Sequence, residues 1–158
     1  MIYGIIDRNI HNFYTYMSVV FNAIDNAQKD YNWMITNCLC YPKNKDIERM
    51  LNQEYCLLSG EELTDIIAKE DFQWVWAVLC GFTKDISLEE ILKYPLPISL
   101  DHNGYFHSPI SLQHPLSSVE IVPCDSSCTI IVSKDKAIVD SYRKHYPSVE
   151  DLSLFNQK

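Results

Sequence analysis

Six cysteines and five histidines are the side chains of this sequence best suited to bind a metal or to act in nucleophilic catalysis. Two pairs of cysteines are close in sequence, Cys38-x-Cys40 and Cys124-x3-Cys128, and neither has the Cys-x2-Cys spacing that is usual in structural zinc sites. In an extended strand, Cys38 and Cys40 face the same side, where they either chelate an ion together or both enter the core. The spacing favours buried thiols. We expect no metal and no cofactor, while metal binding by either pair stays an open alternative.

Nucleophilic catalysis needs a cysteine or serine beside a histidine, and a third group that orients the histidine. Three of the histidines, His102, His107 and His114, lie in the proline-rich segment 94–118 without helical spacing, which favours surface positions. A small hydrolase or transferase that uses a Cys/His site near residues 94–118 is therefore one alternative function.

No catalytic motif supports that alternative. Ser126 and Ser127 follow Asp125 without the Gly-x-Ser-x-Gly pattern of a nucleophile elbow, and turn chemistry accounts for this Asp-Ser-Ser sequence. The chain has only 4 glycines, none of them adjacent, so neither a phosphate-binding loop nor a dinucleotide fingerprint is present. We predict that the protein is not an enzyme.

The paired carboxylates are explained by helix starts rather than by acid–base chemistry. Ser59 to Glu62 and Ser87 to Glu90 both have the Ser-x-x-Glu pattern of a capping box. The first turn of a helix also favours carboxylates through the helix dipole. Both patterns predict the N-terminus of a helix.

The distribution of charge gives the clearest indication of a partner. The net charge is −8, and residues 45–101 contain twelve acidic against five basic side chains, which accounts for −7 of it. Such a field disfavours nucleic-acid phosphates and favours a basic partner. Solvated helix faces that keep the protein soluble are the plain alternative.

The elements that position these residues predict an α+β fold. A chain of 158 residues that is 47% hydrophobic and 22% charged fits a single domain, spanning residues 1–158. Apolar runs alternate with capped helices and then cluster, which predicts a mixed or largely antiparallel sheet covered by helices, with a C-terminal β-hairpin followed by a helix. The predicted strands are 2–7, 31–41, 55–58, 72–82, 119–123 and 128–133. The predicted helices are 46–52, those opened by the two capping boxes, and 136–146, with a last helical turn after 148.

Four further predictions concern particular segments. Apolar residues spaced by three and four over 10–27 predict a helix of about five turns. Residues 98–107 predict a hairpin around the Asn-Gly turn at 103–104. The run 72–82 predicts the central strand, with Trp74 and Trp76 on one core face. The inner face of the 136–146 helix is predicted to be Ile138, Tyr142 and His145.

The N-terminus lacks the basic and apolar regions of a signal peptide, and no uncharged apolar run approaches the length of a membrane span. We therefore expect a cytoplasmic protein that contacts neither membrane nor nucleic acid.

Residues 114–152, HPLSSVEIVPCDSSCTIIVSKDKAIVDSYRKHYPSVEDL, resemble the tail of small acidic bacterial proteins. These are immunity-like or uncharacterised proteins found around polymorphic and contact-dependent toxin systems. The shared pattern is a strand, an Asp-Ser-Ser turn, a strand ending in Ser-Lys-Asp, and a terminal helix. The Tyr31–Asn32–Trp33 sequence before a strand also fits it.

The resemblance implies a protein that binds and neutralises a cognate toxin, often a nuclease with a basic active-site cleft. The acidic middle of the chain agrees with such a partner. The residues we expect to bind it are Glu61, Glu62, Asp65, Asp85, Glu89 and Glu90. A non-catalytic regulatory module without a toxin partner is a further alternative.

Overall fold

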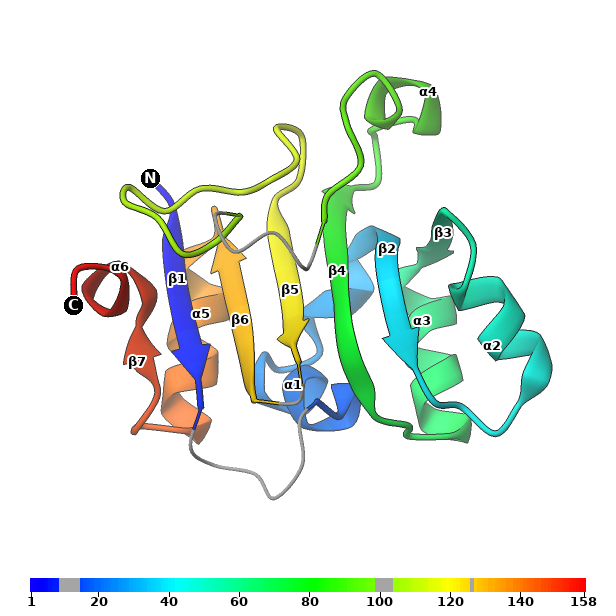
Figure 1. Ribbon diagram of the computed structural model, residues 1–158, viewed down its shortest axis with the longest axis horizontal. Coiled ribbons are helices and arrows are strands. Elements are labelled where there is room, and N and C mark those ends of the chain that lie inside the picture. Colours follow the sequence, from blue (N-terminus) through cyan, green and yellow to red (C-terminus); the bar gives the residue numbers. More distant parts are fainter. Residues whose placement is uncertain (9–14, 99–103, 126) are drawn as a thin grey trace.

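A computed structural model describes residues 1–8, 15–98, 104–125 and 127–158. Its seven strands form one antiparallel sheet in the order β3-β2-β4-β5-β6-β1-β7 (Figure 1). The strands are β1 (Tyr3–Asp7), β2 (Tyr31–Cys40), β3 (Tyr55–Ser59), β4 (Trp74–Thr83), β5 (Val119–Cys124), β6 (Cys128–Ser133) and β7 (Glu150–Asp151).

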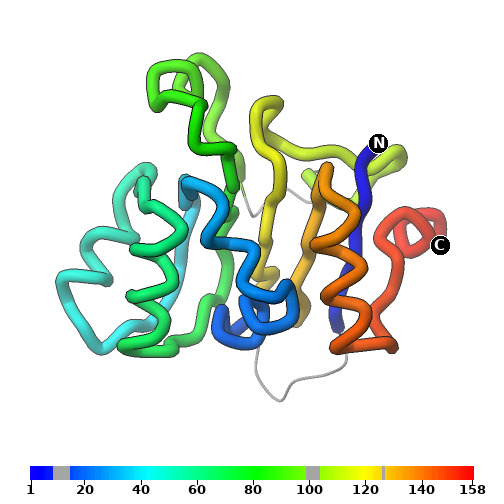
Figure 2. Tube along the Cα trace, turned by 180° about the vertical axis from the view of Figure 1, so that it is seen from behind, coloured from blue at the N-terminus to red at the C-terminus, as the bar shows by residue number. Residues whose placement is uncertain are grey.

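Helices cover the two faces of the sheet unequally. The helices are α1 (Met17–Ala23), the 3-10 helix η1 (Ala27–Asp30), α2 (Lys45–Leu51), α3 (Gly60–Lys69), α4 (Leu88–Ile91), α5 (Lys136–His145) and α6 (Leu152–Asn156). Seen from behind, α1, α3 and α5 lie side by side across one face (Figure 2). The opposite face is covered by α6 and by the segment 104–118, and α4 projects beyond one end of the sheet (Figure 1).

Strand alternation divides the core between these two faces. In β6, Ile131 belongs to the core under α1, α3 and α5, while Ile130 and Val132 belong to the core on the other side. All three are fully buried. Because side chains alternate along a strand, a sheet covered on both faces requires continuous apolar runs like this one.

The α+β prediction is confirmed, including the C-terminal hairpin β5–β6 followed by α5. Both capping boxes form as the sequence predicts. The Ser59 hydroxyl accepts the amide of Glu62 at 3.0 Å, and the Glu62 carboxylate accepts the amide of Ser59 at 2.9 Å. Asp135 caps α5 by accepting the amide of Ala137 at 3.0 Å.

The predicted five-turn helix over 10–27 is wrong in its described part, because α1 has only seven residues. Before it, Tyr16 is extended and bridges Gln73, and the backbones of Thr15 and Trp74 exchange two hydrogen bonds of 2.9 and 2.8 Å. After it, Asp25 and Asn26 adopt left-handed backbone conformations that end the helix. The predicted positions 10–14 lie outside the described residues.

The two tryptophans of β4 lie on different faces, which corrects the predicted common face. Trp74 pairs with Cys40 and Trp76 with Leu39, so the register between β2 and β4 shifts between these two pairs. This irregularity sends Trp74 into the core under the helices, where it is fully buried, while Trp76 stays half-buried and lines a surface pocket. Strand β4 is an interior strand, but β5 occupies the centre of the sheet order.

Two smaller predictions also fail. Tyr105–His107 forms no strand, so this half of the predicted 98–107 hairpin is wrong, while residues 99–103 lie outside the described part. His145 lies on the exposed side of α5, where its Nδ1 is 3.0 Å from the carbonyl of Ser141. Val139 takes the predicted buried place instead. Among the described residues, no helix is long and apolar enough to cross a membrane.

Candidate functional site: an acidic end of the sheet

The strand directions bring two acid-rich helix starts to one end of the sheet. Strands β3 and β4 are both antiparallel to β2, so they run in the same direction and finish at the same end. Ser59 at the end of β3 pairs with Asn32, and Thr83 at the end of β4 pairs with Tyr31. The N-terminus of α3 follows β3 directly, and the N-terminus of α4 follows β4 after residues 84–87. We call the six predicted partner-binding carboxylates in or beside these starts the acidic end. Glu61, Glu62, Glu89 and Glu90 lie in the first turns of the two helices, Asp65 lies one turn further along α3, and Asp85 lies in the turn before α4.

An ion pair joins the two halves of the acidic end. The Lys84 ammonium lies 3.1 Å from a carboxylate oxygen of Glu61, with both side chains about half exposed. Hydrogen bonds from its own backbone and from Lys84 lower the pKa of Glu61. The pKa of Asp85 is also lowered, chiefly by a hydrogen bond from the Thr83 side chain. Both carboxylates therefore stay ionised at neutral pH.

Two of the six carboxylates also hold the fold. Glu62 and Glu90 close the capping boxes of α3 and α4 by accepting the amides of Ser59 and Ser87. Asp65 and Glu89 are exposed and belong to no cap and no ion pair in the described part of the chain. A test of partner binding is therefore cleanest at Asp65 and Glu89.

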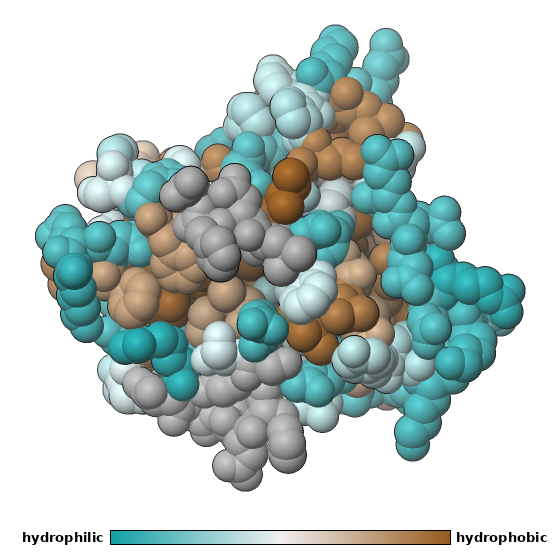
Figure 3. Space-filling view, in the orientation of Figure 1, coloured by the Kyte–Doolittle hydropathy of each residue, from teal (hydrophilic) through white to brown (hydrophobic). Residues whose placement is uncertain are grey.

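Exposed apolar side chains accompany the acids on the projecting α4 segment. Leu88 is 39% exposed, Leu92 is 41% exposed and Tyr94 is 38% exposed, whereas Ile91 between them is buried. In the space-filling view, hydrophobic atoms appear at this projection among hydrophilic ones (Figure 3). An apolar patch rimmed by charges is typical of a protein-binding surface.

A buried histidine attaches this projection to the body of the protein. His114 is fully buried, and its Nε2 lies 2.9 Å from the carbonyl oxygen of Ile91. Its Nδ1 accepts the amide of Leu116 at 3.1 Å, so the proton must be on Nε2, which donates to Ile91. The ring also packs edge-on against Phe82 and Tyr94. His114 therefore has a structural role and is not the surface histidine that the sequence suggests.

The sequence patterns assign no role to Glu120 in the central strand, although among the described residues it is the acid with the most hydrogen bonds. Its carboxylate is fully buried and accepts the Tyr105 hydroxyl at 2.6 Å and the Ser117 hydroxyl at 2.8 Å. It also accepts the backbone amides of residues 113 and 114 at 2.9 and 2.8 Å. Burial, followed by the charge of Glu120, raises the pKa values of Tyr105 and Cys80. The sequence feature that indicates a buried, hydrogen-bonded acid here is a single glutamate within the otherwise apolar strand β5.

No match was found when the chain was compared with protein-family models, curated proteins and solved structures.

The Cys/His alternative finds little support in segment 94–118. The imidazole of His107 lies 3.2 Å from the Ser111 hydroxyl, but no carboxylate contacts this ring among the residues the structure describes. His102 falls outside those residues. Within the same described part of the chain, no three metal-binding side chains lie close enough to hold an ion.

The two cysteine pairs form thiol–thiol contacts. The Cys38 thiol donates to the Cys40 sulfur at 3.6 Å, which raises the pKa of Cys38 well above its usual range and makes it a poor nucleophile. Cys124 and Cys128 are directly paired across the β5–β6 turn. A hydrogen bond from Cys128 lowers the pKa of Cys124.

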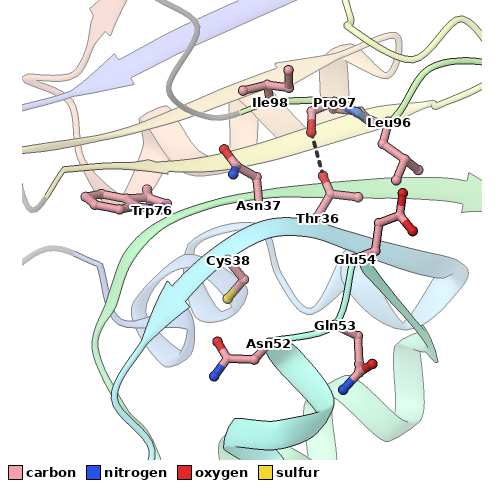
Figure 4. A pocket seen from close by; sticks show the side chains of 10 residues that line it. All are labelled: Thr36, Asn37, Cys38, Asn52, Gln53, Glu54, Trp76, Leu96, Pro97 and Ile98. Carbon is pink, nitrogen blue, oxygen red and sulfur yellow. Dashed lines mark hydrogen bonds between the residues drawn. The ribbon is translucent and has the colours of Figure 1, made fainter.

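A pocket of about 480 Å³ lies between the irregular part of β2, the α2–β3 connection and residues 96–98 (Figure 4). Thr36 bridges it by donating to the carbonyl of Pro97 at 3.0 Å. Among the described residues that line it, Glu54 is the one charged side chain, which disfavours anionic ligands. Cys38 is the only thiol there, and its raised pKa argues against covalent chemistry in this pocket.

Proposed function

We propose that this protein is a non-catalytic inhibitor that binds and neutralises a basic protein toxin through its acidic end, as an immunity protein of the cytoplasm does. One observation carries the proposal. Strands β3 and β4 run in the same direction on either side of β2, so the acid-rich starts of α3 and α4 lie at the same end of the sheet, beside exposed Leu88 and Leu92.

The acidic and apolar groups have different roles in this proposal. Exposed carboxylates speed the encounter with a positively charged cleft, such as that of a nuclease, and occupy its phosphate-binding positions. Burial of Leu88, Leu92 and Tyr94 then supplies affinity that salt does not screen. This combination distinguishes a binding surface from a face that only keeps the protein soluble.

The test is a pull-down from the lysate of the source cell with three forms of the protein, at low and moderate salt. The test variant is Asp65→Lys/Glu89→Lys. The control is Asp46→Lys/Asp140→Lys, which reverses two exposed helical acids elsewhere and also breaks their ion pairs with Arg49 and Lys136. Asp46 lies at the start of α2. This helix follows β2, which runs antiparallel to β3 and β4 and so finishes at the end of the sheet away from the acidic end. Asp140 lies on α5.

The proposal expects one basic protein to be retained by the wild type and the control, but lost by the test variant or as salt rises. Equal retention by all three forms would refute a role for the acidic end. A neighbouring reading frame that encodes a large protein with a basic, variable C-terminus would favour the immunity role over a regulatory module. Melting temperatures within a few degrees of each other would show that the variants are folded.

A further inference from the structure

Strand β3 is the open edge of the sheet. It pairs with β2 through five consecutive residue pairs without a register shift, and within the described chain no strand pairs with its other side. The opposite edge strand, β7, is only two residues long. An open strand of five residues is a template for one more strand.

The backbone geometry shows which groups of β3 point outward. The amide of Ser59 donates to the Glu62 carboxylate, so it does not point toward β2. Because backbone groups alternate in direction along a strand, those of Tyr55 and Leu57 point away from β2 as well.

A second hydrogen bond supports this assignment of the inward-facing and outward-facing residues of β3. The carbonyl of Gly81 accepts from Ser118 on the β5 side, so the backbone of its pairing partner Trp33 must point away from β4 and toward β3. Trp33 pairs with Leu58. Leu58 therefore bonds to β2, and its neighbour Leu57 faces outward. In the described structure, no backbone hydrogen bond outside the sheet reaches Tyr55 or Leu57.

The sequence of β3 lacks the residues that usually block the addition of a further strand. Edge strands usually carry lysine, proline or a bulge that blocks a further strand. Strand β3 is YCLLS, with none of these. Tyr55 and Leu57 are half-buried and pack against the core on the sheet face opposite the main helices.

The charges around this edge select the kind of strand that fits. Residues 50–68 contain no lysine or arginine, and their four acids are Glu54, Glu61, Glu62 and Asp65. Glu54 precedes β3 directly, and the other three follow it on α3. Like charges disfavour pairing with a second copy of this chain, whereas basic residues at both ends of an added strand would be attracted.

We propose that an extended segment of a basic partner protein adds to β3 as a further strand, with its backbone bonded to Tyr55 and Leu57 and its flanking lysines or arginines beside Glu54 and the acids of α3. This inference rests on the proposed function for the basic character of the partner. It adds the mode of binding, in which main-chain hydrogen bonds supply affinity and the flanking charges supply specificity.

The probe for the test is a capped synthetic peptide of alternating valine and threonine with two lysines at each end. Amide hydrogen exchange of the ¹⁵N-labelled protein is followed by NMR with and without the peptide. The proposal expects rapid exchange at Tyr55 and Leu57 in the free protein, slowed about tenfold or more at saturating peptide because both amides become hydrogen-bonded.

Two matched changes remove the backbone bonds without removing charge. A peptide N-methylated at alternate residues should bind about tenfold more weakly or worse, since it loses donors along one edge. Leu57→Pro removes an outward donor at a position where an edge strand tolerates proline, and should weaken the unmethylated peptide similarly. If Leu57→Pro does not fold, the methylated peptide still decides the question, because it leaves the protein unchanged.

The outcomes separate this inference from the proposed function. Peptide-induced shifts at Glu61 and Asp65 without protection at Tyr55 and Leu57 would overturn strand addition while leaving the acidic end as a binding surface. No binding of any peptide would also overturn strand addition, and the pull-down would still test the proposed function. Concentration-dependent self-association that protects the same amides would show that a second copy occupies the edge instead.

Discussion

The hydroxyl of Tyr105 donates to the carboxylate of Glu120 at 2.6 Å, and both side chains are buried between the sheet and the segment that covers it. The same carboxylate accepts the backbone amide of His114, whose ring in turn donates to Ile91 at the end of α4. A chain of hydrogen bonds therefore runs from the central strand to the projecting, acidic α4 segment. This buried acid is therefore one of the groups that connect the candidate binding surface to the sheet.

Replacement of Glu120 by alanine should lower the free energy of unfolding by about 3–5 kcal/mol, because several buried donors lose their acceptor at once. Tyr105→Phe, which removes one bond, should cost about 1–3 kcal/mol. Urea denaturation measures both. A loss below about 1 kcal/mol for Glu120→Ala would show that the network contributes little to the fold.

Gly60 at the first position of α3 has no room for a side chain. A Cβ there would lie 2.2 Å from the carbonyl oxygen of Gln28 and 2.6 Å from the Cα of Lys29. Gly60→Ala should therefore destabilise the protein by about 1–3 kcal/mol, although alanine is the better helix former. The matched control is Ala68→Gly at an exposed position of the same helix, which should cost about 1 kcal/mol through helix propensity alone. Thermal melts compare the two, and stabilisation by Gly60→Ala would contradict the packing.

The features that the sequence predicts well are local ones. The capping boxes at Ser59 and Ser87 need only side chains three residues apart, so their pattern is sufficient. The apolar runs of β5 and β6 likewise predict strands without knowledge of their neighbours.

The features that the sequence does not predict depend on distant residues. The helix that starts at Met17 is shortened because Thr15 and Tyr16 pair with the start of β4, more than fifty residues away. The role of Glu120 depends on donors from a segment without regular secondary structure. The charge pattern of the sequence indicates the six acids of the candidate site. Their common location depends on the directions of β3 and β4, which bring the starts of α3 and α4 to one end of the sheet.

Cys124 should be the most reactive thiol. It is partly exposed, and the hydrogen bond from Cys128 lowers its pKa, whereas burial raises the pKa of Cys56 to about 11. Iodoacetamide at pH 8 should therefore modify Cys124 first, as mass spectrometry of digests would show. Cys128→Ala should slow this reaction several-fold, and Cys56→Ala should leave it unchanged. Equal rates in Cys128→Ala and wild type would rule out the activating bond.

Acid should loosen the C-terminal segment. Hydrogen bonds from Lys158 and then Arg8 lower the pKa of Glu150 below that of the unfolded chain. Its stabilising contribution is therefore present above the unfolded pKa and is lost as pH falls through the lowered folded value. The protection factors of the α6 amides, which correct for the intrinsic pH dependence of exchange, should fall between about pH 5 and pH 3 more steeply in wild type than in Glu150→Gln, which lacks this titration. Identical pH profiles would contradict this role for Glu150.

The most direct test of the acidic end is the rate at which the purified partner associates with the protein, measured by stopped-flow fluorescence at several salt concentrations. We expect the wild-type association rate constant to fall about tenfold or more between low and moderate salt. Asp65→Lys/Glu89→Lys should associate slowly at all salt concentrations, while Asp46→Lys/Asp140→Lys should behave much more like the wild type. An association rate that is insensitive to salt, or reduced equally in both variants, would contradict binding through the acidic end.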